Sequence, residues 1–564
     1  MSVPTNFQPL TRFFLLLQPD NKEIRNVYIF AILSGLFGLI LPLGIQAIIN
    51  FIQTGQVTAS WFVLVFAVVV AILLSGLLNI FQMRITENLQ QRIFVKAAFD
   101  FADRIPKVQM EELLKRYAPE LTNRFFDTLT IQKGISKLLI DLTSAILQII
   151  FGLLLLAFYH SFFIFFGFGL LLLLFFIFKY TSQKGLKTSM DESKIKYKIA
   201  HWLEEMAHSR LSFKMAGNPR YSLKRTDKYL DEYVKARDAH FGVLMRQYGY
   251  LIGFKVLIAL ALLLIGGLLV ISQSMNIGQF VAAEIVILLI LSSVEKLILS
   301  LEVAYDVLTA IEKIGEVTDL QLERTDGSDL TQKGAFAIEA QELIFKSDLY
   351  QRPVLNDFSV KINPGEKVVF VSDSSVSIQV FFALLGGIYQ DYEGVISINK
   401  VALNSLHLNS LRDKIGNALY FDKFIPGTIE ENISLGRTYV PFEEVQRVAA
   451  LIGLDDDLHY FPNGFQTVIT PDAHFLPKHV IRKIMLCRSL AGSPGLLLLE
   501  EPIYGLKEKQ IEQVLTVLKN TNDATILIST ERKEILNLVD RVVYIEKGKV
   551  VFDGTTDAYT KNVL

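Results

Sequence analysis

Six long apolar runs dominate the first three hundred residues of the chain. They lie near residues 27–52, 61–82, 136–158, 161–180, 248–272 and 278–301. Each is about 20 residues long or longer, which is the length that an α-helix needs to cross the hydrocarbon core of a bilayer. The pattern therefore predicts six membrane-spanning helices.

The polar segments between these runs alternate in length and charge. The links after the first, third and fifth runs are only a few residues long and contain no Lys or Arg, whereas residues 83–135 and 181–247 are long and basic. Because Lys and Arg accumulate on the cytoplasmic side, we expect both long stretches and both termini to be cytoplasmic. Apolar residues recur there at helical spacing, which favours helices that continue out of the membrane over independent soluble domains. Residues 10–17 are typical of a short amphipathic segment on the inner surface.

The pattern changes after Leu301. Residues 302–317 continue as a more polar helix, and 325–329 is typical of a linker. From Gly334 onward, short apolar strands alternate with helices, and the run at 496–499 is continuously apolar, as in a buried parallel strand. The chain is thus predicted to comprise an α-helical transmembrane domain at 1–325 and an α/β domain at 330–564.

Composition supports a membrane protein and excludes other classes. Of the 564 residues 51% are hydrophobic, and the net charge is -1; the mean hydropathy is +0.37. Binding to nucleic acid would need a clustered basic surface, so no nucleic-acid partner is expected. The single cysteine, Cys487, excludes an internal disulfide. No signal peptide is recognised, and no metal site is predicted.

Several short segments resemble one family. They are Asn363–Lys367 (NPGEK), Gly427–Ile433 (GTIEENI), Arg488–Leu490 (RSL) and Leu496–Pro502 (LLLLEEP). Together with six spans and a following α/β domain, they resemble a half-transporter of the ABC exporter type over nearly the whole chain. The segment Leu41–Ala47 (LPLGIQA) resembles bacterial type I secretion and peptide exporters in particular. The family uses ATP and Mg²⁺.

The phosphate-binding loop of that family is not retained. A working loop needs glycines for close backbone approach, a Lys for the β and γ phosphates and a Ser or Thr hydroxyl for Mg²⁺. The resemblance places Ser372, Ser375 and Ser377 at the glycine positions, Ile378 at the Lys position and Gln379 at the hydroxyl position. We therefore expect no tight binding of ATP.

The family's signature segment is also changed. It corresponds here to Leu476, Pro477, Lys478, His479 and Val480. Proline removes a backbone donor, and the lysine and histidine replace glycines that allow a phosphate to approach closely. This segment is therefore not expected to close over a partner's nucleotide.

The resemblance assigns further positions that would act on the nucleotide. The loop glutamine corresponds to Tyr420, the switch histidine to Glu531 and the D-loop aspartate to Lys507. Only the Mg²⁺ carboxylate and the general base remain acidic, as Glu500 and Glu501. Without a bound nucleotide we interpret both as retained for strand geometry, although a glutamate that still polarises water is the alternative.

These losses define the predicted function. Charge-assisted hydrogen bonds contribute about 1.5 to 3 kcal/mol each, so the missing contacts should weaken ATP binding by roughly 10³-fold or more. The chain is predicted to be a subunit of a bacterial inner-membrane export system whose ATPase domain is inactive. The alternatives are a non-transporting membrane scaffold that uses this domain for dimerisation, and an ATPase with relocated contacts.

The expected partners follow from the resemblance. Six spans make half of a two-fold assembly, so a homodimer or a heterodimer with another half-transporter is expected. The family places each ATP between one subunit's phosphate loop and the other's signature, so this chain would impair both sites of a heterodimer. A membrane-fusion adaptor and membrane lipid are further possible partners, and the substrate is not specified.

Charged residues inside the spans are further candidates, because they are costly in lipid. Lys255 and Glu295 lie at similar depths in the fifth and sixth spans, so we expect them to pair. Glu284 lies nearer the outer side and faces either a substrate path or the membrane surface. In the C-terminal domain, the basic stretch Lys478–Lys483 is interpreted as a solvated helix face, with binding of an anion or lipid headgroup as the alternative.

Overall fold

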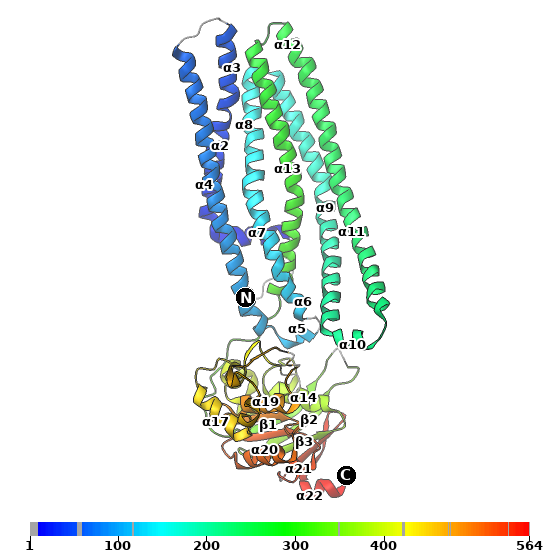
Figure 1. Ribbon diagram of the computed structural model, residues 1–564. Helices are drawn as coiled ribbons and strands as arrows, with labels where there is room; N and C mark the ends of the chain where they lie inside the picture. The colour runs from blue at the N-terminus through cyan, green and yellow to red at the C-terminus, as the bar shows by residue number, and fades with distance from the viewer. Residues whose placement is uncertain are drawn as a thin grey trace. The chain divides into compact units, whose positions relative to one another are not determined.

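The computed structural model describes residues 9–53, 59–114, 118–347, 350–419, 423–471, 473, 475–539 and 541–562. It forms two compact units, Met1–Lys107 with Arg116–Leu320, and Val108–Lys115 with Gln321–Leu564. Figure 1 draws the helices of the first unit and the α/β elements of the second. The segment 108–115, which the sequence pattern left inside the membrane domain, groups with the C-terminal unit.

The first unit contains six helical segments that are long and apolar enough to cross a membrane. They cover Pro9–Gln53, Ala59–Lys107, Glu120–Tyr159, Phe162–His208, Arg220–Ile271 and Ile277–Thr318. Each contains one of the apolar runs, which confirms the prediction of six spans. All but the first extend well beyond the apolar run on the polar side, as the helical spacing of residues 83–135 and 181–247 predicted.

The helices of this unit follow one another with short connections. Their bounds are α1 Pro9–Leu17, α2 Asn21–Gly38, α3 Ile40–Gln53, α4 Ala59–Arg104, α6 Ala118–Asn123, α7 Asp127–Lys137, α8 Thr143–Tyr159, α9 Phe162–His208, α10 Arg210–Met215, α11 Pro219–Ala261, α12 Gly267–Ile271 and α13 Ile277–Thr318. Five-residue π-helical turns, Leu138–Leu142 and Leu262–Gly266, connect α7 to α8 and α11 to α12.

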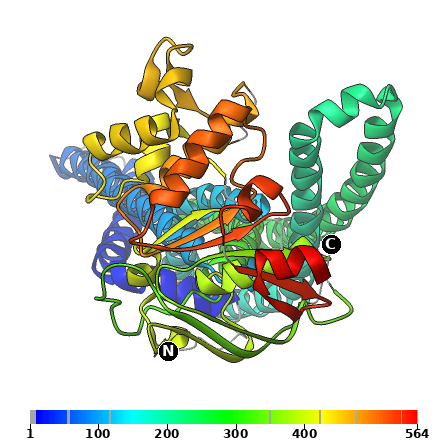
Figure 2. The same ribbon diagram turned by 90° about the horizontal axis from the view of Figure 1, so that it is seen from below.

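Helix α13 forms the centre of the bundle and contacts α7, α8, α9 and α11. Small residues allow this close packing. A side chain at Gly134 would stand 2.1 Å from Val307, and one at Gly152 would stand 2.9 Å from Ile290. Helices α9 and α11 pair along their length, and Figure 2 shows their hairpin projecting from the other helices of the bundle.

The C-terminal unit is built on a six-stranded sheet with the order β12-β11-β3-β10-β9-β6. Its strands are β3 Lys367–Ser372, β6 Ile415–Ala418, β9 Leu496–Glu500, β10 Thr525–Ser529, β11 Arg541–Glu546 and β12 Lys549–Thr555. All neighbours are parallel except β11 and β12. Strand β9 is buried along its whole length, as its continuous apolar run predicted.

A second, antiparallel sheet has the order β2-β1-β4-β5. Its strands are β1 Ile338–Phe345, β2 Leu355–Ile362, β4 Glu393–Ile398 and β5 Val401–Ala402, and a separate pair is β7 Gly427–Thr428 with β8 Val468–Ile469. The helices of this unit are α5 Met110–Leu114, α14 Ser375–Leu385, α15 Leu408–Arg412, α16 Ile429–Ser434, α17 Phe442–Ile452, α18 Asp455–Leu458, α19 Lys478–Leu490, α20 Glu508–Asn520, α21 Lys533–Leu536 and α22 Thr556–Asn562.

Candidate functional site

The connection between β3 and α14 is where a phosphate-binding loop would lie. Strand β3 ends at Ser372 and α14 begins at Ser375, so only two residues separate them. The apolar run that starts at Phe381 predicts a helix beginning near that residue, and this boundary is wrong, because α14 begins at Ser375. Because no glycine interrupts this segment, Ser375, Ser377, Ile378 and Gln379 take up the first turns of the helix.

Side chains at the former loop positions are used within the fold. The Ser377 hydroxyl donates to the carbonyl oxygen of Val354 at 3.0 Å, and this bond is buried. Ile378 lies in the core between the two sheets with 3% of its surface exposed. Ser372 donates to the carboxylate of Asp373 at 3.2 Å. These positions therefore contribute packing and local hydrogen bonds.

A direct hydrogen bond joins the two positions where the family holds Mg²⁺. Nε2 of Gln379 donates to Oε1 of Glu500 at 2.5 Å. Glu500 is 6% exposed, and its main-chain carbonyl accepts from Arg482 at 3.0 Å. The sequence analysis identified both positions but missed their contact. The sequence carried a signal for this contact. Relative to the family, the hydroxyl is replaced by the amide of Gln379 and the aspartate by the longer carboxylate of Glu500.

Glu501, at the position of the general base, is held by neighbouring residues. Its backbone has φ of 46°, in the left-handed region, and its N–H donates to the carbonyl of Ser529 at 2.9 Å. Thr530 donates its hydroxyl to Oε2 of Glu501 at 3.1 Å. Burial raises the pKa of Glu501, so the site favours a neutral carboxyl more than water does.

The segment at the signature position begins helix α19. Pro477 occupies the N-cap position and supplies no capping hydrogen bond. Leu476 and Val480 are buried in the core of the unit, whereas Lys478 is exposed. The turn thus presents a proline ring and a lysine in place of glycine backbone.

The next basic residues point into the domain. Lys483 is 2% exposed and donates to Asp457 and to the carbonyl of Gly453, both at 2.6 Å. The ring of His479 lies 3.2 Å from the other carboxylate oxygen of Asp457. The interpretation of this stretch as a solvated helix face is therefore wrong for these two residues, because a buried aspartate pairs with them.

The remaining family positions lie elsewhere. Glu531 is exposed after the end of β10, and Lys507 precedes the first residue of α20. Tyr420 lies outside the described residues. Glu531 is close enough to act electrostatically on the carboxyl of Glu501.

Segment 108–115 packs into the C-terminal unit through helix α5. Val108 forms an isolated bridge with Leu322, and Oε1 of Glu111 accepts the backbone N–H of Gln390 at 2.7 Å and that of Asp391 at 3.3 Å. The sequence analysis missed this contact, because a carboxylate that caps distant backbone groups leaves no local pattern. A segment between two spans thus belongs to the C-terminal unit.

The structure brings two of the intramembrane charges together. Lys255 on α11 and Glu295 on α13 form an ion pair, and each side chain is about a third exposed, at 33% and 32%. Tyr248 lies 3.4 Å from the same carboxylate. Glu284 is half-buried near the other end of the span on α13. The charges thus lie on one side of α13 rather than scattered around it.

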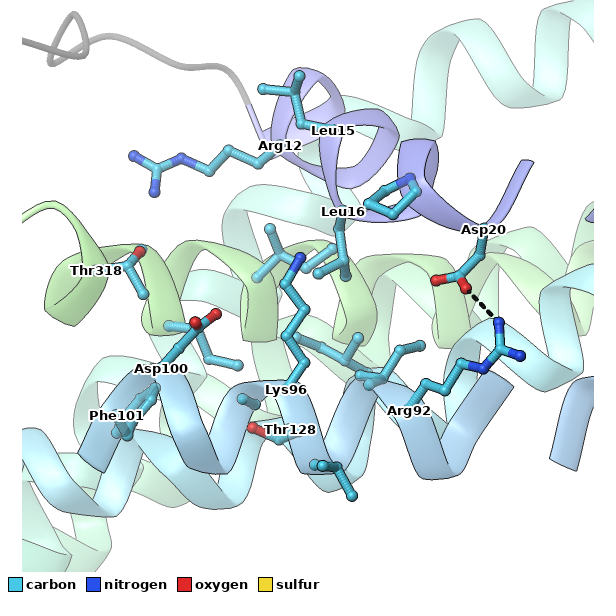
Figure 3. Close-up of a pocket in the computed structure, with 18 of the residues that line it drawn as sticks. Arg12, Leu15, Leu16, Asp20, Arg92, Lys96, Asp100, Phe101, Thr128 and Thr318 are labelled. Carbon is cyan, nitrogen blue, oxygen red and sulfur yellow. Dashed lines mark hydrogen bonds and ion pairs between the residues drawn. The ribbon is translucent and has the colours of Figure 1, made fainter. Parts of the chain in front are cut away.

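A cavity of about 990 Å³ lies beside the amphipathic helix α1. Figure 3 shows Lys96 of α4 extending toward α1, and Arg92 paired with Asp20 at 3.1 Å. Arg12 of α1 pairs with Asp319 and with Glu312 in the same way. The lining holds four cations and three carboxylates, so its formal net charge is only +1.

These contacts decide whether the residues at the nucleotide position can hold Mg²⁺-ATP. Ile378 is buried at the position where a lysine would bind phosphate. At the two Mg²⁺ positions, Gln379 donates a hydrogen bond to Glu500. Serine hydroxyls of the former loop point to protein acceptors. The residues present therefore do not fit Mg²⁺-ATP.

Comparison with known proteins identifies the membrane unit. Residues 24–294 match the model of the ABC transporter transmembrane region. In the solved structures, a bacterial Atm1-family ABC exporter with ATP bound superposes with a TM-score of 0.80, at 17% identity, over 96% of this chain and 97% of that one. This likeness covers both units of the fold.

Curated relatives align with different shares of this chain. A multidrug efflux ATP-binding/permease protein of Mycobacterium tuberculosis is 26% identical over 57% of this chain, and the match spans 26% of that relative. An ATP-dependent lipid A-core flippase of Saccharophagus degradans is 28% identical over 44% of the chain and 42% of the relative. The transport/processing ATP-binding protein ComA of Streptococcus pneumoniae is 22% identical over 97% of the chain and 76% of the relative. The matches thus span a quarter to two-fifths of the first relatives and three quarters of ComA.

Removing Gln379 should expose the cost of burying Glu500. We expect Gln379→Ala to lower the free energy of unfolding by about 1–3 kcal/mol, because a buried carboxylate loses a donor. The matched control is Gln341→Ala, which removes an amide-to-carboxylate bond at the surface, from Gln341 to Glu339. That variant should change stability by less than about 0.5 kcal/mol. Denaturant titration measures both, and equal effects would contradict a structural role for the buried bond.

Neutralising one member of the membrane ion pair should be worse than neutralising both. We expect Lys255→Met to lower stability by about 2 kcal/mol, because Glu295 is left without its cation in a low-dielectric region. The double variant Lys255→Met with Glu295→Gln should recover most of that loss. Thermal unfolding in detergent compares the three proteins, and additive losses in the double variant would refute the pairing.

Proposed function

Because this chain is a half-transporter of the ABC exporter type, we propose that it is a non-catalytic membrane subunit of an export system. The observation that carries the proposal is the hydrogen bond from Gln379 to Glu500, which occupies the positions of the two Mg²⁺ ligands. The fold of the ATPase domain is complete around it, with a buried six-stranded sheet. Its role is then mechanical, as a surface that pairs with another subunit.

The contact of helix α5 supports a mechanical role. Glu111 anchors a cytoplasmic loop of the membrane domain to backbone N–H groups at 390 and 391. Such a contact transmits movement of the α/β unit to the adjoining helices whether or not this unit hydrolyses ATP. Half-buried Glu111 satisfies two backbone donors here, which favours a fixed contact between this segment and the rest of the α/β unit.

The assembly that we propose is a dimer, either with an intact half-transporter or with a second copy. In a heterodimer the energy would come from the partner, although both composite sites would be impaired by this chain's loop and by Pro477 to His479. In a homodimer no site would hydrolyse ATP. A membrane-fusion adaptor and surrounding lipid are further proposed partners. We also propose that both termini are cytoplasmic.

We propose the type of cargo from the relative ComA, whose alignment covers nearly the whole chain. ComA is described as a transport/processing protein and aligns over 97% of this chain. Export of a peptide or protein, as in type I secretion, therefore ranks before export of a lipid or drug. The competing function is a membrane scaffold that moves no solute and uses the pseudo-ATPase domain for dimerisation alone.

Glu501 gives a direct check of the non-catalytic role. In an active enzyme, replacing the general base by glutamine abolishes hydrolysis and transport, whereas here Glu501→Gln should leave export unchanged. Since burial raises the pKa of Glu501, its charge destabilises the fold once pH exceeds the ordinary value of 4.5. The glutamine variant should therefore unfold at a temperature equal to or above that of the wild type at about pH 7, and the gain should vanish near pH 4. Loss of export in this variant would overturn the proposal.

Composition of the native assembly distinguishes transport subunit from scaffold. The tagged chain is purified from its native membrane in mild detergent, and the membrane proteins recovered in near-equal amount are identified by mass spectrometry. Recovery of a second half-transporter with an intact phosphate loop and signature supports the passive-subunit role. Recovery of the chain alone would favour the scaffold.

A further inference from the structure

One face of α13 carries four carboxylates, two within the sixth apolar run and two just beyond it. Glu284, Glu295, Glu302 and Asp306 are separated by 11, 7 and 4 residues. These separations are close to three, two and one turns of an α-helix, so all four lie on the same side. Glu284 and Glu295 lie within the apolar run 278–301, whereas Glu302 and Asp306 lie in the polar continuation of the helix, and the whole stripe is about 33 Å long.

Polar residues of α9 and α11 meet this side of α13 below Glu295. Nε2 of Gln247, which is 1% exposed, donates to the hydroxyl of Thr181 at 2.8 Å and to that of Tyr305 at 3.0 Å. Gly185 on α9 admits the tyrosine ring, since a side chain there would stand 2.4 Å from it. Oε1 of Gln247 is buried without a hydrogen-bond partner among the described residues. The interface thus contains an acceptor that is not satisfied by protein.

His240 lies one layer closer to the cytoplasm and has an open nitrogen. It is 1% exposed, and its Nδ1 lies 2.9 Å from the hydroxyl of Thr188. That hydroxyl donates to the carbonyls of Lys184 and Gly185, both at 3.0 Å. With the Thr188 hydroxyl donating to either of these carbonyls, Nδ1 of His240 is the donor to Thr188 and Nε2 keeps a lone pair. Nε2 is buried and has no partner among the described residues.

Charged groups from all three helices surround this histidine. Glu192 of α9, Arg237 of α11 and Glu302 of α13 act electrostatically on its ring. Arg237 forms an ion pair with Glu192 at 3.3 Å. Glu302 takes no part in that ion pair. Asp306, one turn farther, is exposed and lies within the field of Glu192, Glu302, Arg237 and Lys196. The stripe therefore ends in an acid that reaches solvent.

The upper part of the stripe is the ion pair of the fifth and sixth spans. Glu295 is bound by Lys255, and Tyr248 of the same helix as Lys255 contacts its carboxylate. Tyr248 directly follows Gln247 in the chain, so the ion pair adjoins the buried polar layer. Ionisable groups at this depth are costly, and they mark ion or proton paths in transporters.

We propose that this stripe is a proton-binding relay that links the outer part of the membrane with the cytoplasm. A proton that enters past Glu284 binds the carboxylate of Glu295 and releases its ion pair with Lys255. It leaves through Nε2 of His240, which becomes an imidazolium, and then through Glu302 and Asp306. Only protons move, so no oxidant or reductant is needed. The relay goes beyond the transport role proposed above and would supply a chain without an ATPase with an energy source.

Charge displacement after a pH step tests the relay without knowledge of the substrate. The purified full-length chain is reconstituted in liposomes on a solid-supported membrane, and the pH is stepped from about 8 to about 6, across the range where histidine titrates. Without ATP, the wild type should give a transient current well above that of empty liposomes. Glu295→Gln and His240→Gln should each reduce the displaced charge about fivefold or more, because the first removes a proton-binding step within the membrane field and the second blocks the exit toward the cytoplasm.

Asp191→Asn is the matched control. Asp191 is the sequence neighbour of Glu192, pairs with Lys194 at the surface of α9 and does not face the stripe. This variant should keep the wild-type transient. Glu302→Gln serves if Glu295→Gln does not elute as a folded protein on size exclusion. A wild-type signal equal to that of empty liposomes, or an unchanged signal in the Glu295, Glu302 and His240 variants, would overturn the proposal.

Discussion

A carboxylate that is removed from water needs a donor, and this requirement shapes both units of the chain. In the α/β unit, buried Glu500 is bound by Gln379, and buried Asp457 is bound by Lys483. In the membrane unit, Glu295 is bound by Lys255. An unpaired charge at any of these places would cost several kcal/mol. At the position where the resemblance expects Mg²⁺ to neutralise Glu500, the structure has a protein donor, Gln379.

The fold of the α/β unit does not depend on nucleotide. Two large apolar clusters surround the central sheet, one on each side of strands β3, β9 and β10. Ile378 belongs to one of these clusters, at the position where a phosphate-binding lysine would reach out of the fold. The isoleucine at this position thus adds to the core, and the packing of the α/β unit is complete without a nucleotide-binding lysine.

Much of the architecture was predictable, because it rests on local patterns. The six spans follow from run length, and β9 follows from a continuous apolar stretch. The pairing of Lys255 with Glu295 was inferred from their depths alone. Contacts that join distant parts of the chain were not predictable, as with Gln379 and Glu500 or Glu111 and Gln390. The start of α14 was misjudged because serines next to a strand are typical of a loop, whereas here they form the first turn of a helix.

Equilibrium binding of Mg²⁺-ATP to the purified full-length chain tests the central claim most directly. Titration calorimetry in detergent or nanodiscs should detect no binding up to about millimolar nucleotide, since the ammonium, the Mg²⁺ hydroxyl and the loop glycines are all replaced. A saturable isotherm with a sub-millimolar Kd would contradict the account, because it would require Gln379 and Glu500 to separate and a phosphate site to form.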